Sequence, residues 1–212
     1  MAGTTDPDEP IRSVEIELTF DVDDAAPLPE WEGVPGIARV EEAPRRDLDA
    51  RYFDSTGLEL ARAGVAVRRR TGGPDAGWHL KGPREGLARV ELGWPLGPDD
   101  DVVPSAVRSA VAAVTEAPLQ LIARILNTRT PYLLLDEEGG IVAEFVDDRV
   151  VATDERSGTV RRWREWEVEL GPAASTDADA RAALFAAAGS AISAVGGVPA
   201  ASASKLARAL GE

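Results

Sequence analysis

The chain of 212 residues contains no cysteine and only one histidine, His79. Without cysteine it can have no disulfide, no thiol nucleophile and no thiolate metal site, and one histidine cannot build a multi-histidine metal site. Any metal site would therefore need oxygen ligands, which favours magnesium, manganese or calcium.

Positive charge is also scarce, because 23 lysines and arginines face 37 aspartates and glutamates, for a net charge of -14. This balance argues against nucleic acid as the main partner and against an anionic membrane surface. Long hydrophobic runs are missing too. Residues 182–200 are mostly Ala, Gly and Ser and are interrupted by Pro199, so we expect no membrane span.

The first ten residues are polar and acidic and lack the apolar centre of a signal peptide. We expect residues 1–10 to form a disordered tail and residues 11–212 to form a single domain. The whole is expected to be a soluble, cytoplasmic protein.

Two stretches alternate apolar and acidic residues. In residues 14–20, Glu15 and Glu17 share one face of a predicted strand, and the apolar residues share the other. In residues 159–170 the same alternation gives an acidic face of Glu165, Glu167 and Glu169. Glutamates at positions i and i+2 repel each other unless a cation lies between them, and a divalent metal is one candidate.

Basic residues follow the same rule in the middle of the chain. Arg68 and Arg70 share a face of the predicted strand 65–70, and His79 and Lys81 share a face of the strand 78–81, which Gly82 and Pro83 are expected to end. The strand 89–92 has Arg89 and Glu91 on one face.

The remaining pattern predicts roughly eight strands, mostly in antiparallel hairpins, with helices inserted between them. A charged face on nearly every strand would be costly to bury in an ordinary core. It fits an α+β fold with a closed eight-stranded antiparallel β-barrel, a polar lumen and helices packed outside. Helical spacing is expected at residues 58–63, 103–114, 118–126, 177–195 and 202–210.

Several phrases together resemble the CYTH superfamily, also called triphosphate tunnel metalloenzymes. They are the two acidic strands, Arg-x-Arg at 68–70, Trp-His-Leu-Lys at 78–81, Tyr-Phe-Asp at 52–54 and Ser-Lys-Leu-Ala-Arg at 204–208. The motifs occur in the family's order, and the resemblance covers residues 12–210.

The resemblance implies a tunnel that binds a linear triphosphate and hydrolyses it with Mg²⁺ or Mn²⁺. It implies metal ligands at Glu15, Glu17, Glu167, Glu169 and Asp147, with Asp148 as the alternative to Asp147. It implies phosphate ligands at Arg68, Arg70, Lys81, Arg89, Arg129 and Lys205. The proton acceptor for the attacking water is predicted to be Lys81 or a glutamate of the second acidic strand, for which we name Glu165.

The chain departs from the family pattern at Thr19, where the opening motif Glu-x-Glu-x-Lys has lysine. This removes one cation and keeps open the alternative of a weakened module that binds triphosphate or polyphosphate. A second alternative is an organic triphosphate, either thiamine triphosphate or a nucleoside triphosphate, including cyclase action on ATP. Many bacterial members carry a helical CHAD domain after the Ser-Lys-Leu-Ala-Arg motif, which leaves two alternatives, a stand-alone protein or a domain excised from a full-length protein with a CHAD domain as partner.

Overall fold

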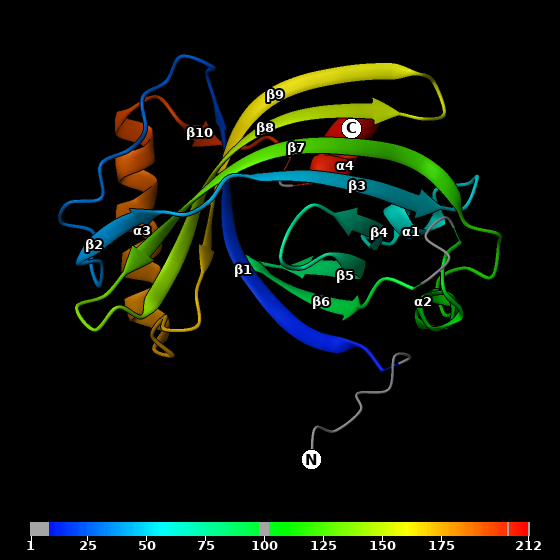
Figure 1. The fold of residues 1–212 in the computed structure, drawn as a ribbon, viewed down its shortest axis with the longest axis horizontal. Helices are drawn as coiled ribbons and strands as arrows, with labels where there is room; N and C mark the ends of the chain where they lie inside the picture. Colours follow the sequence, from blue (N-terminus) through cyan, green and yellow to red (C-terminus); the bar gives the residue numbers. More distant parts are fainter. Residues whose placement is uncertain (1–8, 98–101, 203, 212) are drawn as a thin grey trace.

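The computed structural model describes residues 9–97, 102–202 and 204–211, so the expected disordered tail lies outside the described residues except for its last two. Within these ranges, eight antiparallel strands close into a ring in the order β1-β6-β5-β4-β3-β7-β8-β9, and β9 pairs back onto β1 (Figure 1). The predicted α+β fold with a closed eight-stranded antiparallel barrel is confirmed. The strands of the ring are β1 (Ile11–Val22), β3 (Arg46–Asp54), β4 (Ala66–Thr71), β5 (Gly77–Glu85), β6 (Ala88–Trp94), β7 (Gln120–Leu135), β8 (Ile141–Asp154) and β9 (Thr159–Leu170).

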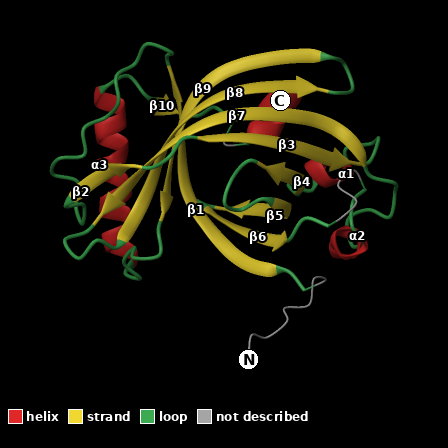
Figure 2. Ribbon diagram, viewed as in Figure 1, coloured by secondary structure: helices red, strands yellow, loops and turns green. Residues whose placement is uncertain are grey.

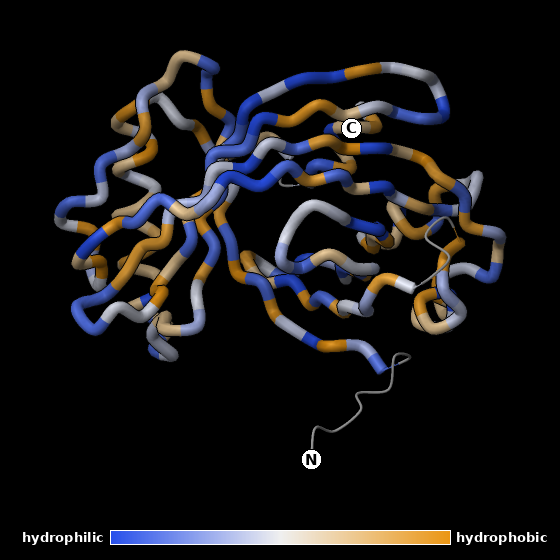
Figure 3. Tube along the Cα trace, viewed as in Figure 1, coloured by the Kyte–Doolittle hydropathy of each residue, from blue (hydrophilic) through white to orange (hydrophobic). Residues whose placement is uncertain are grey.

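Two shorter strands extend the ring without entering it. The strand β2 (Arg39–Glu42) pairs with β7, and β10 (Val198–Pro199) pairs with β1. The period-two pattern predicted for β1 is visible in Figure 3 as alternating hydropathy along the strand. Phe20 of β1 joins the outer core, whereas Glu15 and Glu17 face the lumen.

The outer surface of the ring is covered by helices on two sides (Figure 2). The helix α3 (Ala178–Ala194) begins at Asp177, whose side chain accepts a hydrogen bond from the Ala180 amide. It packs on the outward side chains of β8 and β9, including Phe145 and Trp166. The helices α1 (Glu59–Arg62) and α2 (Ser105–Val111) cover the outer face of β3 to β6, around Trp78. Among the described residues, none of the helices has both the length and the apolar character needed to cross a bilayer.

The helix α4 (Lys205–Leu210) is packed differently, because it contacts side chains that face the lumen. Its first turn is capped by Ser204, and Leu206 and Leu210 pack against Ala50 and Ile125 of the inner wall. In Figure 1 it lies beneath β7 and β8. The helix therefore fills one end of the tunnel and brings its first residue, Lys205, into the cavity.

The helix expected at residues 118–126 is wrong, because β7 begins at Gln120. A β-bulge shifts the register between β3 and β7 at this point and leaves Ile122 without a paired residue on β3. As a result Ile122 and Ala123 are both buried although they are consecutive. This breaks the period of two and produces apolar spacing that imitates a helix.

The expected end of a strand at Gly82 and Pro83 is also wrong, because β5 continues to Glu85. The register between β5 and β6 shifts between Lys81 and Arg84. Proline is tolerated within a strand at such an irregularity, where its missing N–H removes no ladder hydrogen bond. The continuation brings Arg84 into the tunnel wall, where it contacts Glu17.

Candidate functional site

A cavity of about 350 Å³ lies inside the ring, with an acidic wall and a basic wall. The acidic wall comes from β1 and β9, which pair directly, so that Glu17 lies opposite Glu169. The basic wall comes from β4, β5, β6, β7 and α4. Ten residues predicted as ligands line this cavity: Glu15, Glu17, Glu167, Glu169, Arg68, Arg70, Lys81, Arg89, Arg129 and Lys205.

One set of carboxylates beside the cavity is paired with two cations, and we call Asp148, Glu165 and Glu167 the paired acidic group. Ligand atoms of the three lie within 4.8 Å of one another. Arg129 forms a two-point contact with Asp148, at 2.8 Å and 2.7 Å, and a third hydrogen bond of 2.6 Å to Glu167. The Lys205 ammonium lies 3.0 Å from Asp148 and 2.7 Å from Glu167, and it contacts Glu165.

The pKa values follow from these contacts. Burial alone would raise the pKa of Asp148, but Arg129 and Lys205 outweigh it and lower the pKa below its usual range. The same balance, with Lys205 contributing most, lowers the pKa of Glu167. Burial raises the pKa of Glu165 in spite of Lys205. The group is therefore a set of buried charges satisfied by two cations of this chain.

A second set lacks this balance, and we call Glu15, Glu17 and Glu169 the open acidic group. Burial, and then the negative charges of Glu15 and Glu17, raise the pKa of Glu169 to about 7. Burial and a hydrogen bond with Glu91 raise the pKa of Glu15 to about 7, although the Lys81 ammonium lies 2.5 Å from it. Glu17 contacts Arg84, so in this group it is at Glu15 and Glu169 that burial outweighs the nearby cations and makes the carboxyls take up protons more readily.

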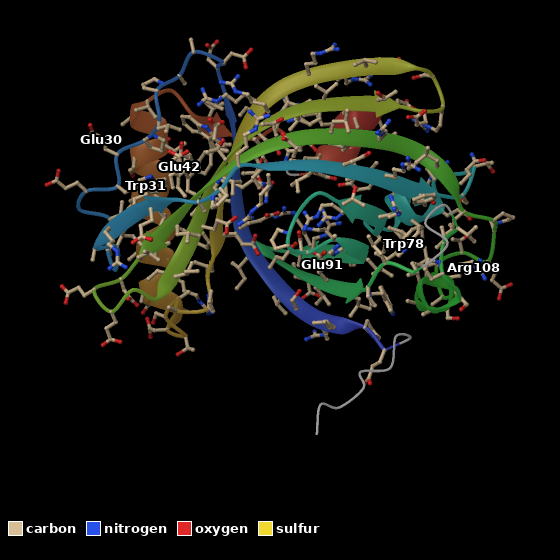
Figure 4. The ribbon with its side chains drawn as sticks, in the orientation of Figure 1. Glu30, Trp31, Glu42, Trp78, Glu91 and Arg108 are labelled. Atoms are coloured by element: carbon tan, nitrogen blue, oxygen red, sulfur yellow. The ribbon has the colours of Figure 1, made fainter. Side chains whose placement is uncertain are left out.

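Glu91 on β6 connects several of these residues, and the sequence analysis assigned it no role. It is buried, its carboxylate contacts Nδ1 of His79, and it lies 3.1 Å from Lys81 and 3.5 Å from Arg68. Burial would raise its pKa, but the hydrogen bond with His79 and the charge of Lys81 lower it far below its usual range. Figure 4 shows Glu91 directed into the ring. The signal for it was its place on the same strand face as Arg89.

Two predicted residues lie away from the cavity lining. Asp147 points to the outer side of β8, where it accepts hydrogen bonds of 2.8 Å and 3.0 Å from Arg164 and one of 3.1 Å from the Trp166 indole. Its neighbour Asp148, given as the alternative, points inward because successive strand residues face opposite sides. Glu165 faces inward but is closed in by Lys205 and by the Trp163 indole.

Arg89 lines the cavity but directs part of its guanidinium to the backbone. Its Nε donates to the Gly82 carbonyl at 2.6 Å, and a terminal nitrogen donates to the Gly64 carbonyl at 3.2 Å. Burial lowers its pKa, and the neighbouring Arg84 adds to this effect.

Thr19 lies opposite Glu167 in the pairing of β1 with β9, and its hydroxyl is buried without a hydrogen-bond partner among the residues that the structure describes. A lysine at this position would lie beside Glu167. In this chain a cation reaches Glu167 from another element, because Lys205 of α4 contacts it.

Two further ion pairs lie at the more exposed end of the cavity. Arg46 binds Glu144 at 3.1 Å, with about a quarter of each side chain exposed. Arg70 contacts Asp75, whose side chain is 48% exposed. All four side chains line the cavity. Of these four residues only Arg70 belongs to a motif recognised in the sequence. The other three lie outside those motifs.

A closed antiparallel tunnel with one acidic and one basic wall is the class of protein that this geometry defines. Residues 13–198 match the CYTH domain family, and the chain belongs to that family.

Two uncharacterized proteins from two strains of Mycobacterium tuberculosis are 38% identical over 213 aligned positions, which cover 95% of this chain. The match covers 41% of each relative, so the chain spans about two fifths of their length. Among solved structures, a protein of Bacillus halodurans described as a putative adenylate cyclase has a TM-score of 0.60 at 16% identity, covering 93% of this chain and 97% of that one. A Hippeastrum protein, described as a putative adenylyl cyclase with dominant triphosphatase activity, has a TM-score of 0.58 at 16% identity, covering 93% and 95%. At these identities the structural likeness concerns the fold.

Proposed function

We propose that the tunnel hydrolyses inorganic triphosphate to pyrophosphate and phosphate with the help of Mg²⁺ or Mn²⁺. The observation that carries this proposal is the cavity with a basic wall facing an acidic wall. Triphosphate is a dense anion, and its hydrolysis requires positioning and charge neutralisation more than covalent chemistry by the protein. The two walls supply both.

The basic wall would bind the phosphate oxygens. Arg68, Arg70 and Arg129 present planar guanidinium groups, which suit phosphate in a two-point manner, and Lys81 and Lys205 add point charges. These cations are already held by carboxylates of the empty tunnel, so their positions are fixed before an anion arrives. Binding therefore needs an exchange of carboxylate for phosphate rather than an ordering of free side chains.

The open acidic group fits a divalent cation, because its donors are all carboxylate oxygens and a bound cation would offset the burial that raises the pKa values of Glu15 and Glu169 to about 7. Glu15, Glu17 and Glu169 would hold the ion, with Glu167 beside them. When bound, the metal would neutralise phosphate charge and activate the attacking water. The paired acidic group suits this role less, since Arg129 and Lys205 already satisfy it.

The two predicted proton acceptors differ in their surroundings. Lys81 lines the cavity and contacts Glu15 and Glu91, a setting that suits a role in binding phosphate. Glu165 is outside the cavity lining and contacts Lys205. We therefore propose that Glu165 positions Lys205 and that Lys81 binds substrate.

An inorganic substrate is favoured over an organic triphosphate by the composition of the lining. Within the described residues, Tyr52 is the only aromatic side chain in the cavity wall. Its hydroxyl hydrogen-bonds to Arg68. A nucleobase or thiamine ring would need a stacking surface that this wall does not offer. The triphosphatase activity described for the Hippeastrum protein supports the same reaction class.

The test is phosphate release from tripolyphosphate with Mg²⁺, Mn²⁺ or a chelator, beside the double variant Glu15→Gln/Glu17→Gln. We expect release that depends on the metal and falls at least about 100-fold in the variant. Asp147→Asn is the matched control, because it removes a carboxylate from the outer face of the barrel and should leave metal dependence unchanged. Release that is equal in the double variant would contradict the proposal.

The binding-module alternative rests on Thr19 and makes a different prediction in the same experiment. A binding module would retain tripolyphosphate without releasing phosphate under any metal condition. Calorimetric titration of tripolyphosphate into the chelated protein separates this outcome from a protein that has no affinity for the anion.

A further inference from the structure

The turn between β4 and β5, residues 72–76, is fixed in place by close backbone contacts. Gly72 has a φ of +87°, and a Cβ there would overlap the Asp47 carbonyl. A Cβ on Gly77, at the other end of the turn, would lie 2.5 Å from the Trp94 carbonyl oxygen. The Ala76 amide donates to the Gly73 carbonyl at 3.3 Å. The turn therefore has little freedom to move away from the tunnel.

His79 fixes the same turn from inside the barrel. Its Nε2 lies 2.9 Å from the Asp75 carbonyl oxygen and must be the donor, because a carbonyl only accepts. Its Nδ1 contacts Glu91, which in turn lies beside Lys81 and Arg68. The position of Asp75 is thus tied to the phosphate-binding wall.

The carboxylate of Asp75 contacts the guanidinium of Arg70 at the edge of the cavity. Asp75 is 48% exposed, whereas the side chain of Arg70 is 11% exposed. Burial, and then the charges of Arg68 and Arg129, lower the pKa of Arg70 to about 9. Positive charge is therefore concentrated here, and the Asp75 carboxylate holds the position on Arg70 that a phosphate oxygen would otherwise take.

The opposite end of the cavity is filled by α4, whose Leu206 and Leu210 pack against the inner wall. Side-chain exposure rises from 0% at Asp148 and 14% at Lys205 to 48% at Asp75. An anion bound against Lys205 can therefore lengthen toward the more exposed end of the cavity, where Asp75 and Glu144 lie.

We infer that Asp75 determines the length of the anionic chain that the tunnel accepts, an inference that rests on the proposed function. A short triphosphate displaces the carboxylate from Arg70 and ends there. A longer polyphosphate must place further negative charge beside Asp75. The turn that carries Asp75 is fixed, so it cannot move this residue away from the added charge. Two like charges about 4 Å apart near a protein surface oppose each other strongly enough to change affinity about tenfold or more.

The experiment compares Asp75→Asn with the unsubstituted protein by calorimetric binding of tripolyphosphate and of a long linear polyphosphate in chelator. Asparagine retains the size and the backbone contacts of the turn but removes the charge. We expect affinity for both anions to rise and the ratio of long-chain to tripolyphosphate affinity to rise about tenfold. Glu138→Gln, in the exposed turn between β7 and β8 and outside the cavity lining, should leave the ratio unchanged.

The same titrations distinguish a failure of the role of Asp75 from a failure of the proposed function. A ratio that is equal in Asp75→Asn and the unsubstituted protein, when both bind tripolyphosphate, overturns the role of Asp75 alone. Absence of tripolyphosphate binding in the unsubstituted protein overturns both this role and the proposed function. Far-ultraviolet circular dichroism of each variant confirms that the barrel is intact.

Discussion

The paired acidic group of β8 and β9 and the open acidic group of β1 and β9 share a strand and yet differ in how far nearby cations offset the burial of their carboxyls. The paired group of Asp148, Glu165 and Glu167 is neutralised by two cations supplied by β7 and α4. The open group of Glu15, Glu17 and Glu169 retains two carboxyls with pKa values of about 7. Carboxylates with internal partners stabilise the fold, and carboxylates without enough partners are available to a ligand. Acidic alternation alone does not distinguish these two roles.

The largest effect is expected when the paired group loses a cation. Lys205→Met leaves three buried carboxylates with Arg129 beside Asp148 and Glu167 and with Arg208 3.9 Å from Glu165. Leaving buried charges uncompensated costs about 3–5 kcal/mol of unfolding free energy, which urea denaturation would measure. Lys205→Arg preserves the charge and should lose much less. Equal stability of the methionine variant and the unsubstituted protein would remove the distinction between the groups.

The next effect concerns the cation beside the open group. Lys81→Ala should lower the rate of tripolyphosphate hydrolysis about 100-fold, because it removes a phosphate ligand from the cavity wall. Lys81→Arg should retain activity within about tenfold, since arginine also binds phosphate. Steady-state phosphate release measures both. An arginine variant as inactive as the alanine variant would instead identify Lys81 as the proton acceptor.

A smaller effect is expected in the dependence of stability on pH. The pKa of Glu169 is about 7 in the folded protein and near the ordinary value of 4.5 in the unfolded chain. Between these values the folded state binds more protons, so the unfolding free energy falls as the pH rises from about 4.5 to 7. The loss should be on the order of 1–3 kcal/mol in chelator.

Two comparisons sharpen this pH prediction. Glu169→Gln should flatten the slope, and Mg²⁺ should restore stability at pH 7 because it binds the ionised form. Asp148 and Glu167 of the paired group have lowered pKa values, so their contribution is present throughout this range and is lost only at more acidic pH. A slope that is unchanged in Glu169→Gln would locate the titrating group elsewhere.

The smallest effect is expected from Thr19→Lys. The new ammonium would lie opposite Glu167, which already contacts Lys205 and Arg129. An added cation in the wall should raise affinity for tripolyphosphate a few-fold in calorimetry, with a change in stability below about 1 kcal/mol. If the substitution instead creates hydrolysis in a protein that previously only bound the anion, the binding-module alternative gains.

Much of the fold could be predicted because alternation survives in most strands. The strand expected at residues 159–170 is β9, with the same bounds, and the helix expected at 177–195 is α3 within one residue at each end. The failures at residues 118–126 and at Gly82 have one cause, which is a register shift between paired strands. Such shifts depend on the partner strand and leave no local signal.

The site could be predicted as a set of residues but not as two groups. Motifs identified the inward glutamates of β1 and β9, and the resemblance supplied the basic residues. The choice between Asp147 and Asp148 required the absolute direction of β8, which alternation does not give. The neutralisation of Glu167 required contacts between β7, β9 and α4, which are distant in sequence. Pairing of charges is therefore the part of the site that only tertiary structure reveals.

The closure of the ring through β1 and β9 has a consequence for how the protein is made. Glu17 and Glu169 become neighbours although they are roughly 150 residues apart in the chain. During synthesis β1 leaves the ribosome long before β9 exists, so its edge remains unpaired while the intervening strands emerge. The open acidic group comes together only when this last pairing forms, so an incomplete nascent chain lacks the assembled set of inward carboxylates.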